Sequence, residues 1–265
     1  MKVICRCRSE VTLLLQRPLI HTLMLTALLC FNTAKAEVET LVVGADSWPP
    51  FRFVTPETVT GIDHELWKKL SKRIGFKVHY LRCPWKRCLR MMKNGQIDAM
   101  SGLAWREERA EYITYADPHY YSCSTQLYLP HGKSRRISKH RDMHAMTIGM
   151  VGGSAYYTEF DQDTDIYKKS VTQEAVLPNL LLEGRIDSFI GTDCQADYEL
   201  ASRGLTPQID KAVFKPGNKV DLFVGLSSNS RWALRKQEFD QALQQLREED
   251  FEGNALKLIS PFAVE

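Results

Sequence analysis

Beyond its first 36 residues, the chain lacks any apolar run long enough to cross a bilayer, which requires roughly 20 apolar residues. It also lacks an excess of either charge. Residues 1–36 carry five of the 35 Lys and Arg residues and one of the 32 Asp and Glu residues, so the remainder has a net charge near −1. That balance excludes a nucleic-acid-binding protein that relies on overall positive charge. The basic run at residues 133–141 has no interleaved aromatic residues and is interpreted as an exposed linker.

The sequence is equally poor in motifs for catalysis or metal binding. Ser154 lies in Gly-Gly-Ser-Ala, which lacks the Gly-x-Ser-x-Gly spacing of a hydrolase nucleophile. The cysteines include no second close pair, so a zinc site is not predicted from them. His140 and His144 have the spacing of two metal ligands on one helical turn, but Asp142 is the only carboxylate near them in the sequence. We interpret this segment as a solvated linker and predict no metal site.

The first 36 residues have the three-part order of a secretory signal peptide. A basic start is followed by an apolar stretch at residues 19–31 and by Ala34-Lys35-Ala36, which is a small-x-small cleavage site. We predict cleavage after Ala36 and export to the periplasm. The alternative, a retained membrane anchor, would need a longer apolar stretch.

Four cysteines follow the predicted cleavage site: Cys83, Cys88, Cys123 and Cys194. In an oxidising compartment, four cysteines allow three complete pairings. Cys83 and Cys88 flank a predicted turn between a strand and a helix, so we predict a disulfide between them. The sequence leaves the state of the other two open.

Predicted strands alternate with predicted helices along the chain. Residues 41–45 and 76–81 have strand patterns, and between them four apolar residues share one helical face: Ile62, Leu66, Leu70 and Ile74. A second helical pattern, at residues 84–95, leads into a strand at residues 97–102. Alternation of this kind predicts an α/β fold with a mainly parallel sheet.

A weak internal repeat divides the chain into two related parts. Residues 89–102 are echoed without a gap at residues 178–191. In each copy an amphipathic helix ends at Gly and a short apolar strand follows, and an opening strand comes earlier, at residues 41–45 or 147–151. We therefore predict two similar lobes, with Asp98 and Asp187 in structural roles. The matching pairs are Gly95 and Gly184, Ile97 and Ile186, Asp98 and Asp187, and Gly102 and Gly191.

Several of the predicted strands end in small or polar residues. In open parallel sheets, ligands bind beyond the carboxyl ends of the strands. The first predicted lobe has such ends at residues 46–48 and 101–102, and the second has them at residues 152–154 and 191–193. We expect these four ends to face one crevice, as in a clamp that closes on a ligand.

Residues 38–265 resemble the periplasmic solute-binding proteins of the polar amino-acid family, which serve ABC transporters. The most specific stretch is GQIDAMSGLAWREERAEYITYADPHY, and GADSWPPF, GIDHEL, IGMVGGSAYY and ALQQLREEDFEGNALKLI add to it. The resemblance implies a periplasmic binding protein type II fold, in which two hinge strands join two α/β lobes that trap the ligand. It places lobe 1 at residues 37–127 and 220–265, and lobe 2 at residues 128–219.

The resemblance also implies ligand-binding roles. Arg109 matches the arginine that pairs with the ligand α-carboxylate, and its planar guanidinium can donate two parallel hydrogen bonds to such a group. Trp48 matches an aromatic wall, and Asp46 lies near an acidic position that contacts cationic ligands. At a helix start, the backbone N–H groups of residues 153–154 are expected to face the anionic end of the ligand. The remaining implied contacts are Ser101, Gly102, Trp85 and Ser154.

The chain departs from the family pattern at several positions. Ala104 and Arg106 replace a common Ser and Thr, and Ala155 replaces a Thr. Thr192 stands where an Asp commonly receives the ligand's amino group, and Asp193 follows it. We expect an intact carboxylate site, an altered amino-group site around Ala155, Thr192 and Asp193, and a position at the rim for Arg106.

These features predict non-enzymatic binding of a small polar solute, an amino acid or related carboxylate, for ABC-type import by lobe closure. The expected partners are that ligand and an ABC permease, with no nucleic acid and no cofactor, and we expect a monomer. Two alternatives stay open. A periplasmic dehydratase would need a general acid or base in the crevice, for which Asp46 and Asp193 are available. A ligand sensor for a membrane receptor would use the same closing motion.

Overall fold

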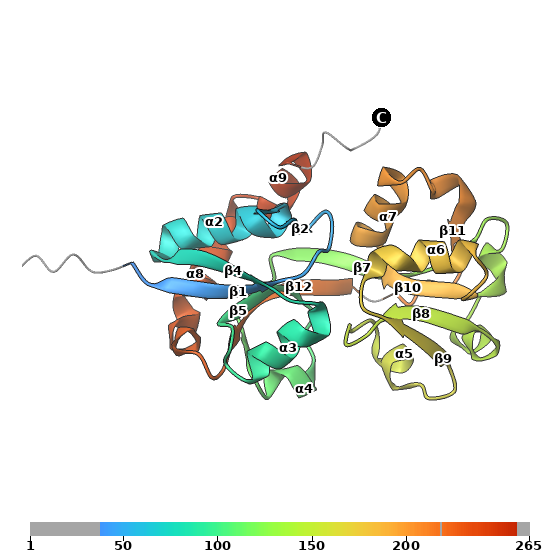
Figure 1. The fold of residues 1–265 in the computed structure, drawn as a ribbon, viewed down its shortest axis with the longest axis horizontal. Helices are drawn as coiled ribbons and strands as arrows, with labels where there is room; N and C mark the ends of the chain where they lie inside the picture. Colours follow the sequence, from blue (N-terminus) through green and yellow to red (C-terminus); the bar gives the residue numbers. More distant parts are fainter. Residues whose placement is uncertain (1–37, 218, 259–265) are drawn as a thin grey trace, which may run out of the picture. The chain divides into compact units, whose positions relative to one another are not determined.

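The computed structural model describes residues 38–217 and 219–258, so the predicted signal peptide lies outside the described residues. Eight strands form one hydrogen-bonded path in the order β4-β1-β5-β12-β7-β10-β8-β9, β6 and β11 pair with β12 and β7 beside it, and β2 and β3 form a separate two-stranded sheet. The first four strands with their helices are called lobe 1, and the last four with theirs are called lobe 2 (Figure 1). Within the described ranges, no helix combines the length and the apolar character that a membrane span requires.

Lobe 1 is a mainly parallel sheet between helices. β1 pairs in parallel with β4 and β5, and β12 pairs antiparallel with β5. Helices α2, α8 and α9 pack together, and α3 and α4 lie across the sheet from α2 (Figure 1). In chain order its elements are β1 Thr40–Ala45, β2 Phe53–Val54, β3 Val59–Thr60, α2 Ile62–Ile74, β4 Lys77–Arg82, α3 Trp85–Lys93, β5 Ala99–Leu103, α4 Glu107–Ala110, β6 Ile113–Tyr115, β12 Lys219–Ser227, the 3₁₀ helix Arg231–Arg235, α8 Lys236–Glu248 and α9 Phe251–Leu258.

The strands of lobe 2 are arranged in the same way as those of lobe 1. β8 pairs in parallel with β9 and β10, and β7 pairs antiparallel with β10. Its elements are β7 Tyr121–Pro130, the 3₁₀ helices Ser134–Arg136 and His140–Ala145, β8 Thr147–Val151, α5 Thr158–Gln162, β9 Tyr167–Val171, the 3₁₀ helix Glu174–Val176, α6 Leu177–Leu182, β10 Ser188–Thr192, α7 Asp193–Ser202, the 3₁₀ helix Thr206–Gln208 and β11 Ile209–Lys211.

The internal repeat extends to individual hydrogen bonds. In lobe 1, Asp98 N donates to Val42 O and Asp98 Oδ2 accepts from Val42 N, both at 2.8 Å. In lobe 2, Asp187 makes the same two bonds with Thr147, both at 2.9 Å. Asp98, which precedes β5, is thereby tied to β1, and Asp187, which precedes β10, is tied to β8. This confirms the structural role predicted for both side chains.

β7 and β12 are the strands that join the lobes (Figure 1). They pair antiparallel, with Cys123 opposite Val220 and Tyr121 opposite Leu222. β12 also pairs with β5 of lobe 1, and β7 also pairs with β10 of lobe 2. The fold is thus the two-lobed α/β arrangement that the resemblance implied. The lobe boundaries predicted at residues 127/128 and 219/220 fall at these strands and remain a prediction.

Helix α2 shows how the sequence pattern produces this packing. Ile62, Leu66 and Leu70 are buried along one face, as their spacing predicts. Burying one such side chain stabilises the fold by roughly 1.5–3 kcal/mol. Lys72 and Arg73 lie in the last turn, where positive charge complements the helix dipole.

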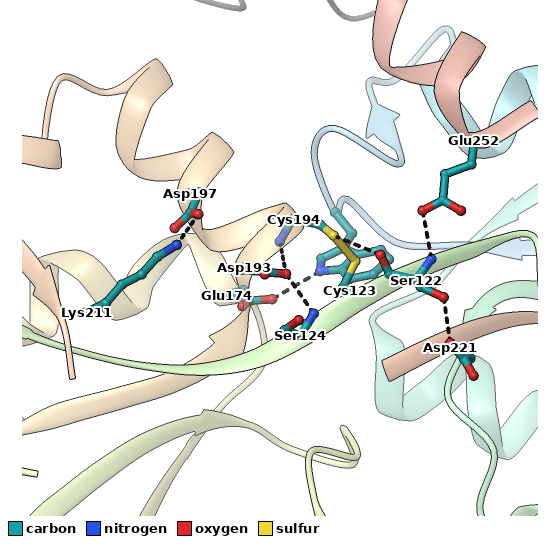
Figure 2. Close-up of a disulfide and its surroundings, with 11 residues drawn as sticks. Ser122, Cys123, Ser124, Glu174, Asp193, Cys194, Asp197, Lys211, Asp221 and Glu252 are labelled. Atoms are coloured by element: carbon teal, nitrogen blue, oxygen red, sulfur yellow. Dashed lines mark hydrogen bonds and ion pairs between the residues drawn. A yellow bond between two sulfur atoms is a disulfide. The ribbon is translucent and has the colours of Figure 1, made fainter. Parts of the chain in front are cut away.

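Two disulfides cross-link the described residues. Cys83 and Cys88 join the end of β4 to α3, which is the pairing that the sequence predicted. Cys123 and Cys194 join β7 to the start of α7 across 71 residues (Figure 2). The sequence could not pair the latter two because the fold alone brings them together.

Removing the Cys123–Cys194 disulfide is expected to cost more stability than removing the Cys83–Cys88 disulfide. A cross-link restricts the unfolded chain more when it closes a longer loop, by about 4 kcal/mol for 71 residues and about 2 kcal/mol for five. Denaturant unfolding of the two double Cys→Ser variants measures the difference. A larger loss of unfolding free energy in the Cys83/Cys88 variant would contradict this prediction.

Candidate functional site

A cavity lies between the two lobes, where the carboxyl ends of the parallel strands meet. It encloses about 630 Å³ of empty space, part of it open to solvent. β7 and β12 form the hinge behind it, and β12 contributes Val220 and Leu222 to its wall. This is the position that an open parallel sheet predicts for a ligand. Other lining residues are Asp46, Ser47, Trp48, Trp85, Gly102, Ala104 and Arg109 from lobe 1, and Val151, Ser154, Ala155, Tyr156, Thr172, Gln173, Glu174 and Thr192 from lobe 2.

Arg109 is a buried cation in the cavity wall. It lies in α4 and is 7% exposed. Its guanidinium donates to the carbonyl oxygens of Ala104 at 2.9 Å and Gly153 at 2.7 Å. Burial is the main cause that lowers its pKa, and Tyr115 and Tyr112 partly offset that effect. A buried guanidinium surrounded by neutral groups is a favourable place for an anion.

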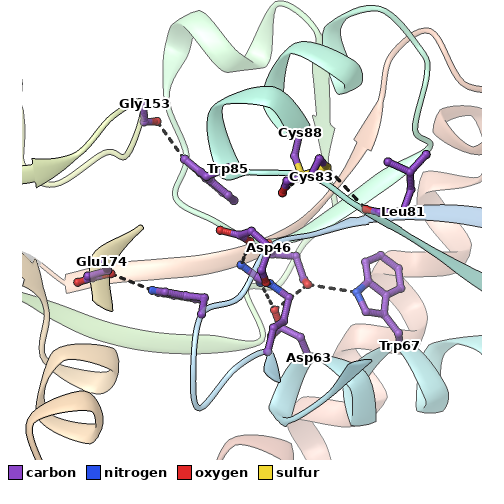
Figure 3. Close-up of polar contacts among 12 residues, drawn as sticks. Asp46, Asp63, Trp67, Leu81, Cys83, Trp85, Cys88, Gly153 and Glu174 are labelled. Carbon is purple, nitrogen blue, oxygen red and sulfur yellow. Dashed lines mark hydrogen bonds and ion pairs between the residues drawn. A yellow bond between two sulfur atoms is a disulfide. The ribbon is translucent and has the colours of Figure 1, made fainter. Parts of the chain in front are cut away.

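Trp85 and the Gly153 turn meet beside Arg109. The Trp85 indole Nε1 donates to Gly153 O at 3.2 Å (Figure 3), and the Arg109 Cζ lies 5.7 Å from the Trp85 ring centroid. The Gly153 carbonyl is therefore held by two donors from lobe 1. The Ser154 N–H donates to Val151 O at 3.1 Å. In this arrangement, the carbonyl of the turn faces Arg109, and the Ser154 N–H is committed within the turn instead of facing a ligand.

Glu174 is a cavity residue that the sequence reasoning missed. Its Oε2 accepts a hydrogen bond from Trp48 Nε1 at 3.1 Å (Figure 3). Its Oε1 is buried and has no hydrogen-bond partner among the described residues. Burial is the largest cause that raises the pKa of Glu174, to about 8, while the bond from Trp48 lowers it and the charges of Glu199 and Asp46 raise it further. One oxygen of this carboxyl group is therefore buried without a hydrogen bond from the described residues, which costs free energy unless a donor reaches it.

Gly191 makes the space that Glu174 occupies. A Cβ atom at position 191 would lie 2.5 Å from Glu174 Oε1, closer than real contacts allow. Because any larger residue in this strand end would displace the carboxyl group, Gly191 has a steric reason for its place in the repeat.

Trp48 and Gly102 pack against each other in the wall of lobe 1. The Trp48 ring stacks on Phe51 with a centroid distance of 4.4 Å. Gly102 has a φ of +75°, and a Cβ atom there would lie 3.1 Å from the Trp48 ring and 3.0 Å from Arg52 Nη1. The small residue at this strand end allows the aromatic ring to lie flat over the strand.

Asp46 lines the cavity, but its charge is already paired. Its Oδ1 accepts from Arg52 Nη2 at 2.7 Å. Arg52 is 3% exposed and also pairs with Asp63. The sequence had placed Asp46 near a ligand cation, and the structure gives it a buried internal partner instead.

Ser101 and Asp193 are the two predicted site residues that do not line the cavity. Ser101 is 2% exposed, accepts from Trp67 Nε1 at 3.1 Å and donates to Asp63 Oδ2 at 2.8 Å. Asp193 begins α7, and its Oδ1 accepts from the N–H groups of Cys194 and Ser124 (Figure 2). Both side chains hold the framework together in positions where the sequence had predicted ligand contact.

Two of the positions predicted to form an altered site for the ligand's amino group, Thr192 and Ala155, lie in the part of the cavity wall formed by lobe 2. Thr192 lines the cavity, and its Oγ1 is buried without a hydrogen-bond partner in the described part of the chain. Ala155 also lines it. Arg106 is half-exposed and forms an ion pair with Asp161 of lobe 2. This position fits the rim placement expected for Arg106 and adds a contact between the lobes.

A family model described as bacterial extracellular solute-binding proteins, family 3, matches residues 41–253. The chain belongs to this family. This solute-binding protein is 24% identical over 219 residues to a putative amino-acid ABC transporter-binding protein, PatH, of Vibrio harveyi, with 81% of this chain and 86% of that protein covered.

Solved structures share its fold. An amino acid ABC transporter substrate-binding protein, AbpA, from Streptococcus pneumoniae, bound to L-arginine, superposes with a TM-score of 0.71 at 21% identity and covers 84% of this chain and 93% of that chain. A histidine kinase sensor domain superposes with a TM-score of 0.71 at 19% identity and covers 85% and 96%.

Proposed function

We propose that this solute-binding protein captures a free amino acid in the periplasm and delivers it to an ABC importer. Membership of the family supports solute binding, and the similarity to the putative amino-acid ABC transporter-binding protein of Vibrio harveyi supports an amino acid as the solute. The likeness to a histidine kinase sensor domain concerns the fold and leaves a signalling role as the alternative. A permease is the expected partner, and the chain acts as a monomer.

The observation that carries the proposal is a pair of incompletely partnered groups in one cavity. Among the described residues, Arg109 is a buried cation that donates to carbonyl oxygens and forms no ion pair with a carboxylate, and Glu174 is a carboxyl group with one buried oxygen that accepts no hydrogen bond. An amino acid presents the complementary groups, a carboxylate and an ammonium. The carboxylate would replace the two carbonyl oxygens now bound to Arg109, and the ammonium would donate to Glu174 Oε1. Trp48 and Trp85 would supply apolar walls.

Ligand binding would favour the closed arrangement of the lobes. Arg109 belongs to lobe 1 and Glu174 to lobe 2, so one ligand would join both. Contacts between the lobes exist without it, from Trp48 to Glu174, from Trp85 to Gly153 and from Arg106 to Asp161. A ligand adds its own free energy to the closed state alone, and that difference shifts the population. A permease could then read the closed state.

We infer binding without turnover. Glu174, with a pKa of about 8, is the group that a dehydratase would use as a general acid or base. Asp46, the other cavity carboxylate, is neutralised by Arg52 and offers no second catalytic group. Recovery of the bound amino acid unchanged after prolonged incubation supports a carrier. Release of a dehydrated product would replace the proposal with the enzyme.

The proposal predicts that one amino acid, or a narrow group of them, raises the melting temperature of the purified protein. Binding to the folded state alone stabilises it by about 2.7 kcal/mol at a ligand concentration 100 times the Kd. A panel of the common amino acids, with dicarboxylic acids and amines as controls, identifies the ligand. Native mass spectrometry of material purified without refolding tests whether it is carried from the cell. No shift from any amino acid, together with a shift from a compound lacking an ammonium group, would contradict the proposal.

A further inference from the structure

Two histidines and one aspartate form a cluster in lobe 2, outside the cavity lining. His140 Nε2 and His144 Nε2 each lie 2.8 Å from the same atom, Asp163 Oδ2. The histidines belong to the 3₁₀ helix His140–Ala145, and Asp163 follows α5. The three atoms lie within 4.8 Å of one another.

We propose that His140, His144 and Asp163 bind one divalent transition-metal ion of the Zn²⁺ class. Two imidazole nitrogens and one carboxylate oxygen form a common donor set for zinc when a fourth position is open to water. Ligand atoms of a tetrahedral zinc site lie about 3.3 Å apart, given metal–ligand distances near 2.0 Å. The two nitrogen–oxygen separations, 2.8 Å each, are somewhat shorter than that value, so the side chains would move apart to admit an ion.

The hydrogen-bond partner of His140 is compatible with both a metal-free and a metal-bound imidazole. His140 Nδ1 lies 2.8 Å from the Tyr157 hydroxyl, which can donate to a bare nitrogen or accept from a protonated one. Without metal, Nε2 carries the proton and donates to Asp163. With metal, Nε2 coordinates, and the proton sits on Nδ1 and is donated to Tyr157. Such an outer hydrogen bond orients the imidazole in metal sites.

Asp163 presents one carboxylate oxygen, Oδ2, to the two histidines. Its Oδ1 accepts from the Asp165 N–H at 2.8 Å, which leaves Oδ2 to face the histidines. Its backbone carbonyl accepts from Lys168 Nζ at 2.7 Å, which fixes the loop after α5. The side chains of His140 and Asp163 are 11% and 15% exposed, and that of His144 is 33% exposed, so an ion can enter beside His144.

Calorimetric titration of the untagged, EDTA-treated protein with ZnCl₂ tests the site. We expect one ion per chain, and we expect His144→Ala and Asp163→Asn each to weaken its binding by at least about tenfold. His131→Ala is the matched control, because His131 forms an exposed pair with Asp210 alone at 3.1 Å. Its titration should equal that of the unchanged protein. Circular dichroism of each metal-free variant identifies any that has failed to fold.

Two results would overturn the proposal. The first is that the unchanged protein binds Zn²⁺ no more tightly than a His140→Ala/His144→Ala double variant. The second is that Asp163→Asn and His144→Ala both fold and both retain full affinity for Zn²⁺. The thiol groups are not competing ligands, since all four cysteines in the described part of the chain form disulfides.

Discussion

Replacing Arg109 with alanine is expected to raise the Kd for the bound amino acid by at least about 30-fold and to abolish its thermal shift. Removing one partner of a buried, hydrogen-bonded charge pair costs roughly 2–5 kcal/mol, and each 1.4 kcal/mol changes the Kd tenfold. Arg109 is the cation proposed to hold the carboxylate, and it is 7% exposed. Isothermal titration calorimetry with the amino acid found in the panel measures the change.

Arg106→Ala is the matched control for that variant. Arg106 precedes α4, which carries Arg109, and its ion pair with Asp161 joins the lobes at a half-exposed position. Exposed or half-exposed pairs are worth about 0.2–1 kcal/mol, so a change in Kd of no more than about fivefold is expected. If Arg109→Ala binds the ligand as tightly as Arg106→Ala does, Arg109 is not part of the site.

Glu174→Gln is expected to remove a pH dependence that the unchanged protein shows. With a pKa of about 8, Glu174 is mostly protonated in the empty protein at pH 6. An ammonium group favours the ionised carboxylate, so binding releases a proton and becomes easier as the pH rises. The Kd should fall by up to about tenfold per pH unit between pH 6 and 8. Calorimetry at several pH values, in buffers of different ionisation enthalpy, measures both the Kd and the released proton.

The sign of the effect on stability follows from the same shift. The folded pKa of Glu174 is raised above its ordinary value of 4.5, so its contribution to stability is present below that value. That contribution is lost progressively as the pH rises from about 4.5 to about 8, because the carboxyl group ionises freely in the unfolded chain while burial keeps it protonated in the folded protein. The empty Glu174→Gln variant should therefore lose less stability than the unchanged protein between pH 5 and 8.

Glu183→Gln separates the cavity effect from a general loss of charge. Glu183 is half-exposed at the end of α6 and pairs with Arg185 at 2.9 Å. Its variant should keep the full pH dependence of binding. A Glu174→Gln variant whose Kd still falls with pH as in the unchanged protein would show that another group receives the ammonium. Failure of any amino acid to bind the unchanged protein would instead count against the proposed function.

Much of the fold follows from local patterns in the sequence. The spacing of Ile62, Leu66 and Leu70 defines the buried face of α2, and the recurrence of Asp98 as Asp187 marks the two lobes. The helical spacing involves residues close together in the chain, and the repeat is a pattern visible in the sequence itself. The Cys123–Cys194 disulfide has no such signal, because it joins the hinge strand β7 to α7 across 71 residues.

The sequence predicted only part of the cavity, because contacts between distant residues leave no pattern in the sequence. Strand-end reasoning correctly located Gly102, Ser154 and Thr192 in its wall. Glu174 follows β9, whose sequence YKKSV has neither an apolar run nor the alternation typical of a strand, so no sequence pattern pointed to the residues beyond it. The pairing of Asp46 with Arg52 depends on tertiary packing that a sequence pattern does not contain.

The histidine cluster illustrates how a neighbouring residue can mislead. Asp142 lies midway between His140 and His144 in the sequence, but its Oδ2 accepts from the backbone N–H groups of residues 138 and 139. The carboxylate that meets both histidines comes from Asp163, about 20 positions further on. Interpreting the segment as a solvated linker therefore overlooked a cluster that the fold completes.

A crystal structure of the protein with the amino acid from the panel tests most directly whether the cavity holds that amino acid with its carboxylate on Arg109. We expect both carboxylate oxygens at 2.7–3.2 Å from the Arg109 guanidinium, in place of the carbonyl oxygens of Ala104 and Gly153. Density for the amino acid in a structure where Arg109 still contacts those two carbonyl groups alone would contradict it.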